Sequence, residues 1–313
     1  MKSHSSLRSQ FQKLRIHLLA PMLRRLGSRR YFDLLQDIGV HVSKVRYDEP
    51  IPDTRTLPED LWNRPQPMVG IDFNDVRQLE LLAQFAQYRT EYDAFPDKPT
   101  ARTHEYFADN GNYLGLDAAI LHCMIRHFQP RRMIEIGSGY STLAAARAVR
   151  ANAAGNPPAP CELAAIEPYP REMLQRGVPG LSQLIPKKLQ DVPLEFFDSL
   201  QGNDILFIDS SHVLTIGGDV EREYLQIIPA LRPGVVVHIH DIFLPMEYPR
   251  RWIMESRWFW NEQYLLQAFL SFNREFEILW AGAYMNLKHP DKLAAFSRYD
   301  RATAQSFWMR RVR

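Results

Sequence analysis

The fold of this chain is decided by residues 133–141, which read Met-Ile-Glu-Ile-Gly-Ser-Gly-Tyr-Ser. An apolar run that ends in two glycines predicts a buried strand and a tight turn, where the backbone can approach a ligand closely. The alanine-rich residues that follow favour a helix. A dinucleotide site would place a third glycine at position 142, which is Thr142, and a phosphate-binding loop would add a lysine. The turn therefore disfavours a phosphate group as its ligand.

Outward from this turn, short β-rich runs alternate with helical runs over residues 106–313, which is typical of a parallel sheet with helices on both faces. The last two strands are expected to form a hairpin-like pair. The sequence thus predicts an α/β domain with a seven-stranded sheet. Its expected strands are residues 132–136, 163–166, 184–189, 205–208, 235–239, 276–280 and 307–312, and its expected helices are 116–128, 141–149, 193–200, 220–228 and 259–272.

Residues 33–105 are expected to form a mainly helical and irregular cover region. Up to residue 67 this region is rich in proline, which fixes φ and removes a backbone donor, so an extended path is expected. Asn74 then precedes apolar residues at three- to four-residue spacing. This spacing predicts an amphipathic helix over residues 74–88 with Asn74 as its cap.

Residues 1–32 form a basic segment, because they contain lysines and arginines but no acid. Pro21 is expected to kink a helix here or to begin a second one. Two interpretations of a basic amphipathic helix remain open. The helix can lie on an anionic membrane surface, or its apolar stripe can pack on the main domain or on a second subunit of a homo-oligomer. The stripe consists of Leu7, Phe11, Leu14 and Leu18.

Composition places the chain among ordinary globular proteins, with 45% hydrophobic and 24% charged residues. The net charge of +2 supplies no electrostatic reason to expect nucleic acid. Cys123 and Cys161 lack neighbouring ligand pairs, so neither a disulfide framework nor a zinc knuckle is indicated. No apolar run reaches the roughly 18 residues of a membrane span, and no signal-peptide cleavage site follows an apolar core. A cytoplasmic location is therefore expected.

Acidic residues follow the expected strands. Glu167 comes after residues 163–166, Asp209 after 205–208, and Asp241 two residues after 235–239. In open α/β sheets, ligands bind at the carboxyl ends of the strands, so these side chains are expected to face a common site. Asp209 and Asp241 end neighbouring strands and should converge. Carboxylates accept hydrogen bonds from hydroxyls and amines, which suits Glu167 to a ribose.

Residues 135–139, Glu-Ile-Gly-Ser-Gly, resemble the acidic-x-Gly-x-Gly motif of class I S-adenosylmethionine-dependent methyltransferases. More narrowly, residues 135–142, 207–212 (Phe-Ile-Asp-Ser-Ser-His) and 240–243 (His-Asp-Ile-Phe) are similar to a bacterial group related to macrocin O-methyltransferase and the cephalosporin hydroxylase-like proteins. The resemblance covers about residues 105–313 and implies a Rossmann-like, mostly parallel sheet of seven strands with an antiparallel last strand.

The same resemblance implies S-adenosyl-L-methionine as the cofactor. Glu135 would reach the methionine amino group, Glu167 the ribose hydroxyls, and Asp191 the adenine amine. A cationic sulfonium has no polyphosphate for these carboxylates to repel. The other residues of the implied cofactor site are Gly137, Ser138, Gly139, Ser141, Val192 and Asp209.

Two arrangements of catalytic groups remain open. In the first, Asp209, Asp241 and His240 hold magnesium, manganese or another divalent ion, which lowers the pKa of the acceptor and orients it. In the second, the aspartates position the substrate and His212 acts as the general base. Related metal-dependent enzymes commonly have an acid at the position of His240 and an amide at that of Ile242, so this chain departs from their pattern.

Two functions from different classes are expected. The first is an O-methyltransferase acting on a hydroxyl of a small molecule, sugar or glycan intermediate. The second is a cofactor-binding protein of the same fold with lost or altered, hydroxylase-like chemistry. Residues 110–113 are turn-forming and could close over the cofactor. Aromatic residues that could serve this lid or simply pack are Tyr106, Tyr113, Tyr140, Tyr248, Trp252, Trp258 and Trp260.

Overall fold

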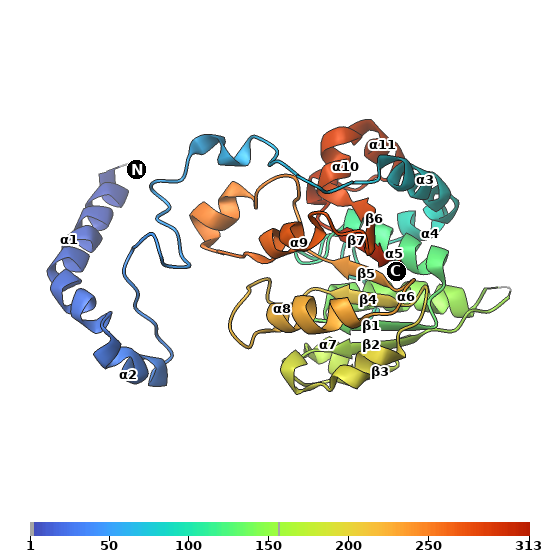
Figure 1. Ribbon diagram of the computed structural model, residues 1–313, viewed down its shortest axis with the longest axis horizontal. Helices are drawn as coiled ribbons and strands as arrows, with labels where there is room; N and C mark the ends of the chain where they lie inside the picture. The colour runs from blue at the N-terminus through green and yellow to red at the C-terminus, as the bar shows by residue number, and fades with distance from the viewer. Residues whose placement is uncertain (1–2, 156) are drawn as a thin grey trace. The chain divides into compact units, whose positions relative to one another are not determined.

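The computed structural model describes residues 3–155 and 157–313, without the side chains of residues 3–12. The chain divides into two compact units, one up to Glu59 and one from Asp60 to Arg313 (Figure 1). Among the described residues, no helix is both long and apolar enough to cross a membrane.

The first unit begins with α1 (Ser3–Leu26), followed by a 3₁₀ turn at Arg29–Tyr31 and by α2 (Phe32–Asp37). The basic segment is thus helical, and the helix continues through Pro21 without starting a second helix. The amphipathic character of this segment stays a prediction. Of its apolar stripe, Leu14 and Leu18 are exposed. The side chains of Leu7 and Phe11 lie outside the described part of the chain.

The second unit is built on one seven-stranded sheet of order β3-β2-β1-β4-β5-β7-β6. Strands β1 to β5 pair in parallel, and β7 lies antiparallel between β5 and β6. The Rossmann-like α/β fold and the antiparallel last strand are therefore confirmed. The strands are β1 (Arg132–Ile136), β2 (Glu162–Ile166), β3 (Gln183–Ile185), β4 (Ile205–Ile208), β5 (Val236–Ile239), β6 (Phe276–Ala281) and β7 (Phe307–Arg311).

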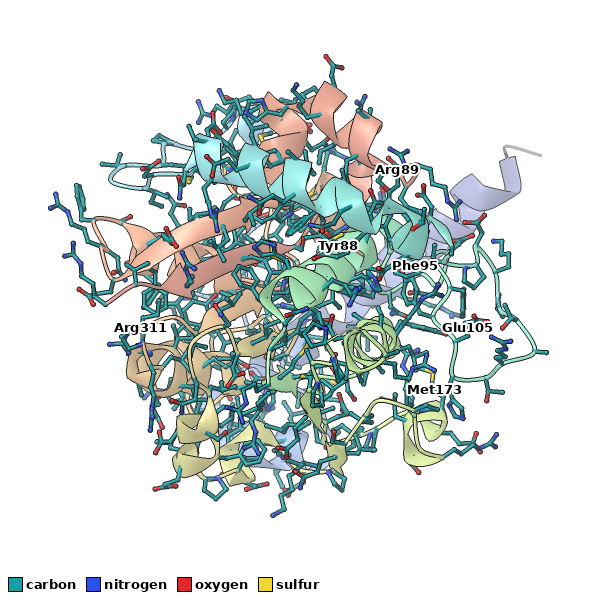
Figure 2. The ribbon with its side chains drawn as sticks, turned by 90° about the vertical axis from the view of Figure 1, so that its right-hand side faces the viewer. Tyr88, Arg89, Phe95, Glu105, Met173 and Arg311 are labelled. Carbon is teal, nitrogen blue, oxygen red and sulfur yellow. The ribbon has the colours of Figure 1, made fainter. Side chains whose placement is uncertain are left out.

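Helices cover both faces of the sheet, because alternate strand residues point to opposite sides. Met133 and Phe207 point into one core, while Ile134 and Ile208 point into the other. Tyr88 and Phe95 pack on the first core beside α4 (Figure 2). Its helices are α3 (Asp75–Phe85), α4 (Arg89–Asp93), α5 (Gly115–Phe128), α6 (Tyr140–Ala153), α7 (Glu172–Gln175), α10 (Gly282–Lys288) and α11 (Pro290–Phe296); the second core is covered by α8 (Asp219–Arg222) and α9 (Glu262–Leu270).

Several local expectations were wrong. The last two strands are no hairpin, because α10 and α11 connect them. The third strand stops at Ile185, since Pro186 cannot donate to the ladder. By contrast, the helices expected at 220–228 and 193–200 are present: α8 continues into a π-helix (Glu223–Ile227), and residues 194–199 form a 3₁₀ helix. Asn74 occupies the N-cap position of α3, but its side chain makes no capping hydrogen bond; its Nδ2 donates to the carbonyl of Ile278.

Candidate functional site

The register of the sheet brings the turn and the acidic residues to one edge. Ile136, Ile208 and Ile239 pair in line as the last residues of β1, β4 and β5. The ladder extends one residue further. The N–H group of Asp209 donates to the carbonyl of Ile136 at 2.9 Å, and the N–H group of His240 donates to the carbonyl of Ile208 at 3.0 Å. Side chains just beyond these strands therefore share one site, as the sequence predicted.

Gly137 is required by the close approach of two loops. Its φ is +82°, and a Cβ built on it would lie 1.9 Å from the carbonyl oxygen of Asp209. Gly139 differs, because a Cβ there would meet open space. Its N–H donates to Thr142 Oγ1 at 3.0 Å, which satisfies a free donor at the start of α6. Gly137 thus sets the backbone of the turn, and Gly139 leaves room beside it.

A cavity of about 460 Å³ opens at the carboxyl ends of β1, β2 and β4. Glu167 lines it and is held from both sides, since Oε2 accepts from Ser138 N–H at 3.2 Å and Oε1 from Tyr169 N–H at 2.8 Å. The full lining is Ile136, Gly137, Ile166, Glu167, Pro168, Lys188, Leu189, Gln190, Asp209, Ser210, Ser211, Thr215, Gly218 and Asp219.

Asp191 and Val192 do not line this cavity, although they end the same 3₁₀ segment as Leu189 and Gln190, which do. Asp191 is exposed, whereas Val192 is buried in the second core. The cavity wall near the position expected for the adenine-binding acid is instead formed by Lys188, Leu189 and Gln190.

Glu135 is fully buried behind the glycine turn. Ser141 Oγ donates to its Oε1 at 2.6 Å, while Oε2 has no hydrogen-bond partner among the described residues. Burial raises the pKa of Glu135 to about 8. Ser138 Oγ is likewise buried without a described partner. Both groups retain hydrogen-bonding capacity toward a bound molecule.

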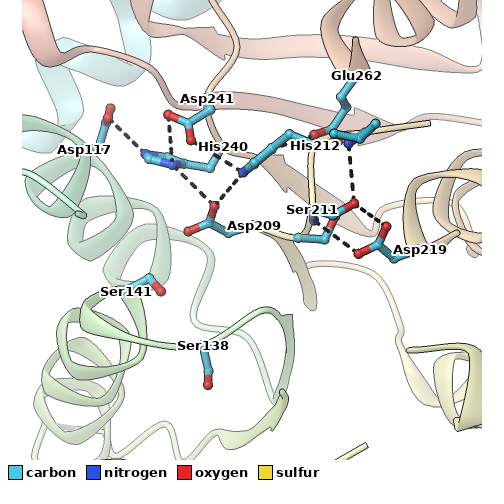
Figure 3. A network of polar contacts seen from close by, with 12 residues as sticks. Asp117, Ser138, Ser141, Asp209, Ser211, His212, Asp219, His240, Asp241 and Glu262 are labelled. Carbon is cyan, nitrogen blue, oxygen red and sulfur yellow. Dashed lines mark hydrogen bonds and ion pairs between the residues drawn. The ribbon is translucent and has the colours of Figure 1, made fainter. Parts of the chain in front are cut away.

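Asp209, Asp241 and His212 converge on the other side of the turn (Figure 3). His212 Nε2 lies 3.3 Å from Asp209 Oδ1 and 3.5 Å from Asp241 Oδ2. The φ angles of His212 and Asp241 are +60° and +56°, a left-handed conformation that costs energy outside glycine. The fold therefore holds both residues in strained loops whose side chains meet.

His240 joins the same cluster from the end of β5. Its Nδ1 lies 3.6 Å from Asp209 Oδ1 and 3.5 Å from Asp241 Oδ1, and its Nε2 lies 3.3 Å from Asp117 Oδ2. Asp209, His240 and Asp241 each offer one donor atom, and these atoms lie within 4.8 Å of one another. The predicted metal-ligand set is thus brought together, as are the three predicted catalytic groups.

The electrostatics of the cluster favour charged imidazoles. Burial opposes the charge on His212, but hydrogen bonds to Asp209 and Glu262 raise its pKa well above the usual value. Burial likewise opposes the charge on His240, yet the charges of Asp241 and Asp209 raise its pKa. For Asp209 the effect is reversed: burial would raise its pKa, but His240 and His212 lower it. Each group thus stabilises the charged form of its neighbours.

The sequence analysis did not identify three acidic residues of this site. Glu262 Oε2 lies 2.8 Å from His212 Nδ1, and Asp117 contacts His240 from α5. Glu223 is buried beside them and accepts from Ser210 Oγ at 3.2 Å. An acid inside the apolar run of α5 was a usable signal for Asp117. No sequence pattern distinguishes Glu262 and Glu223 from other helical residues. Only the packing of α9 against the π-helix brings them to the site.

Residues 110–113 are a turn, as predicted, but Tyr113 of this turn and Tyr106 before it pack inward. Asn110 Oδ1 accepts from the N–H groups of Asn112 and Tyr113, and Tyr106 OH donates to the carbonyl of Tyr113. The Tyr113 ring lies 4.7 Å from the His240 ring. His238, one pleat below, is stacked on Phe207 and buried. These aromatic residues therefore pack around the cluster.

Residues 134–242 match the family model of a methyltransferase domain, which is 109 of the 313 residues. The matched stretch runs from β1 to just beyond β5 and contains Gly137, Glu167, Asp209, His212 and Asp241. An uncharacterized protein of Archaeoglobus fulgidus is 36% identical over 141 residues, which are 44% of this chain and 62% of that protein. The chain thus spans less than two thirds of this relative.

Two solved structures show weak likenesses to the chain. An O-methyltransferase from Bacillus cereus in complex with SAH is 12% identical, with a TM-score of 0.37 over 75% of this chain and 91% of that one. A structure described as cmcI-D160 Mg-SAM is 16% identical, with a TM-score of 0.33 over 63% of this chain and 72% of that one.

Proposed function

We propose that the protein is an S-adenosylmethionine-dependent O-methyltransferase that acts on a hydroxyl of a small molecule, sugar or glycan intermediate. One observation carries this proposal: the cavity at the glycine turn adjoins a cluster of carboxylates and imidazoles. The cavity supplies room for a cofactor, and the cluster supplies groups that can take a proton. The resemblance to the macrocin and cephalosporin hydroxylase-like group supports the same reading.

The cofactor would lie in the cavity beside Gly137. Glu167, held by Ser138 and Tyr169, would accept hydrogen bonds from the ribose hydroxyls. Glu135 would release its proton to solvent as the positive charge of the methionine ammonium group approaches, and its free Oε2 would then accept from that group. Carboxylates at these positions suit a cation and disfavour a polyphosphate. On this basis, adenine would lie against the wall formed by Leu189 and Gln190, next in sequence to Asp191.

Methyl transfer is an in-line displacement. The acceptor oxygen forms a bond to the methyl carbon, the carbon–sulfur bond breaks, and the hydroxyl proton passes to a base. Asp209 and Asp241 would orient the hydroxyl beside the methyl group. His212 would accept the proton at Nε2 in its neutral form, after the proton that it carries in the free protein has passed to solvent, while Glu262 holds Nδ1.

The cluster also fits a divalent cation. When all four carboxylates are ionised and the imidazoles of His212 and His240 are both charged, the cluster keeps two negative charges. The carboxylates are those of Asp117, Asp209, Asp241 and Glu262. The donor atoms of Asp209, His240 and Asp241 lie close enough to hold one ion. Such an ion would lower the pKa of an acceptor hydroxyl.

The proposal is tested by calorimetry with S-adenosylhomocysteine, using the full chain and Glu167→Ala. Loss of a carboxylate contact with the ribose should weaken binding by about 1.5 to 3 kcal/mol. Methyl transfer from labelled cofactor to a pool of hydroxylated acceptors should then be detected. Binding without any transfer would support the alternative, a cofactor-binding protein with altered chemistry.

The role of a metal is separated by treating the protein with a chelator. Activity that falls and returns with magnesium or manganese would support metal assistance. Activity that survives chelation but is lost in His212→Ala would support the general base.

A further inference from the structure

The first unit holds a large share of the exposed apolar side chains. None of residues 13–59 is buried. Of the 25 large apolar side chains that are exposed in the described part of the chain, 13 belong to this unit, which is only 59 of the 313 residues. A surface of this kind indicates a partner, because exposed apolar patches mark interaction sites. Six of the 13 lie on α1: Leu14, Ile16, Leu18, Leu19, Met22 and Leu23.

The same unit carries an excess of positive charge. It contains 11 lysines and arginines against six acids, whereas residues 60–313 are nearly balanced, with 27 against 30. Eight of the 11 cations lie in residues 1–32, where there is no acid. The described ion pairs of the unit join Arg46 to Asp48 and Arg55 to Asp53, and they do not involve α1. The cations of α1 therefore face no acid within their own helix.

On α1 the basic and apolar side chains are interleaved. Lys13, His17 and Arg24 fall within about 40° of one another around the helix, because each residue turns it by about 100°. The six apolar side chains occupy the rest of the circumference, with Arg15 and Arg25 among them. An arginine in such a place can extend its guanidinium to a phosphate while its methylene stem stays in an apolar layer. This arrangement suits the boundary between lipid head groups and acyl chains.

A basic cavity of about 530 Å³ lies where α1 ends. Arg29, Lys44 and Arg46 line it with one acid, Glu49, and Phe32 belongs to its apolar wall. Cations beside an apolar wall suit an anionic head group that is attached to a hydrocarbon chain. The cavity therefore extends the mixed basic and apolar surface of α1 into the next segment of the unit.

Other partners account for only part of this surface. A nucleic acid would pair with the cations but would leave the apolar side chains of α1 uncovered. A symmetric contact between two copies of α1 would set one basic helix against another. An anionic bilayer matches both features, because its phosphates attract lysine and arginine and its acyl boundary takes up apolar side chains.

We infer that the first unit is a peripheral membrane anchor that lays α1 on the surface of an anionic phospholipid bilayer. The inference goes beyond the proposed function and does not depend on it. Binding would place the second unit, with its candidate active site, near that surface.

The test is flotation of the full chain with vesicles of phosphatidylcholine alone and of phosphatidylcholine mixed with phosphatidylglycerol. The mixed vesicles should bind about tenfold more tightly or better, and added salt should weaken this binding. The combined change Arg15→Gln, Arg24→Gln and Arg25→Gln should weaken it by about tenfold or more.

A second variant tests the apolar part of the contact. The combined change Leu14→Ser, Leu18→Ser and Met22→Ser keeps every charge and should still weaken binding to the mixed vesicles by about fivefold or more. Attraction between charges alone would leave this variant unaffected. Its unfolding midpoint and its oligomeric state should equal those of the native chain, because these side chains are exposed.

The charge-matched control combines Lys187→Gln, Arg274→Gln and Lys288→Gln, three exposed cations of the second unit, and should bind the mixed vesicles like the native chain. The inference is overturned if both kinds of vesicle bind equally, if the control loses as much binding as the arginine variant, or if duplex DNA binds more tightly than the mixed vesicles. A serine variant that binds like the native chain, loses an oligomer or unfolds at a lower temperature would also overturn it. Failure of S-adenosylhomocysteine to bind would concern the proposed function alone.

Discussion

The carboxylate of Glu262 lies 2.8 Å from Nδ1 of His212, and neither side chain is more than 6% exposed. Tyr224 OH donates to the other oxygen of Glu262 at 3.2 Å. A residue at the first turn of α9 thus holds the imidazole that faces Asp209 and Asp241. The contact with Glu262 fixes the orientation of the His212 ring and leaves its Nε2 directed at Asp209 and Asp241.

Replacing Glu262 by alanine should therefore affect both stability and activity. The change leaves two buried donors without an acceptor, which costs about 1 to 3 kcal/mol per group. Methyl transfer should also fall by on the order of tenfold or more, because His212 loses its orientation. Urea unfolding and the labelled-cofactor assay measure the two effects. Glu255→Ala, at an exposed position, is the control; equal behaviour of the two variants would remove the assigned role.

Glu135→Gln should change how stability depends on pH. Glu135 keeps its proton in the folded protein up to a pKa of about 8, against 4.5 as its ordinary value. Folding thus takes up a proton between these pH values, and this residue lowers stability as pH rises through them, by at most about 1.4 kcal/mol per pH unit. The variant should gain stability over the native chain from pH 5 to pH 8.

Thermal unfolding in a pH series measures this difference. Glu195→Gln, at an exposed site, should track the native chain throughout. A gap between Glu135→Gln and the native chain that stays constant with pH would show that Glu135 is ionised in the folded protein.

Gly137→Ala and Gly139→Ala should behave differently, although both lie in one turn. At position 137 the new Cβ would overlap the Asp209 carbonyl and require a positive φ, so several kcal/mol of stability should be lost. At position 139 the Cβ meets no described atom, so stability should change by less than about 1 kcal/mol. Calorimetric titration should nonetheless reveal weaker S-adenosylhomocysteine binding by Gly139→Ala. Equal loss of stability would contradict this division.

Asp117→Asn should loosen the start of β7. The Asp117 carboxylate accepts from the N–H groups of Gln305 and Ser306 and contacts His240 Nε2. In the variant, the side-chain NH₂ group would face these N–H groups, which are also donors. The free energy of unfolding should therefore fall by about 1 to 3 kcal/mol. Hydrogen exchange at Ser306 and the unfolding midpoint report the effect. Asp198→Asn, at an exposed site, serves as the control, and unchanged exchange at Ser306 would refute the prediction.

A chain that starts at Asp60 should fold and bind S-adenosylhomocysteine like the full chain. The residues described in the two cores and in the cavity all belong to the unit from Asp60 to Arg313. Removal of α1 and α2 should therefore leave the unfolding midpoint of this unit unchanged within error. A large drop in the midpoint would show that the first unit packs on the second.

Much of the fold could be predicted from local sequence. Strands β1 and β4 lie where their apolar runs end, because burial on both faces of a parallel sheet demands such runs. Errors arose where several conformations compete locally. Residues 282–296 form two helices between β6 and β7, although the sequence suggested a hairpin. Pro186 shortened β3, and the helix expected from residue 259 begins at Glu262.

By itself, the sequence determined the glycine turn, the acids after the strands and the carboxylate pair. Strand order in a parallel sheet brings residues that follow strands to one edge, so Gly137, Asp209 and Asp241 meet as a matter of topology. Only the tertiary structure decided which groups stand behind them. Glu262 and Trp260 reach His212 because α9 packs against the π-helix, and Asp117 reaches His240 because α5 packs into the first core. Such contacts depend on how helices pack across long stretches of chain, and no local pattern encodes them.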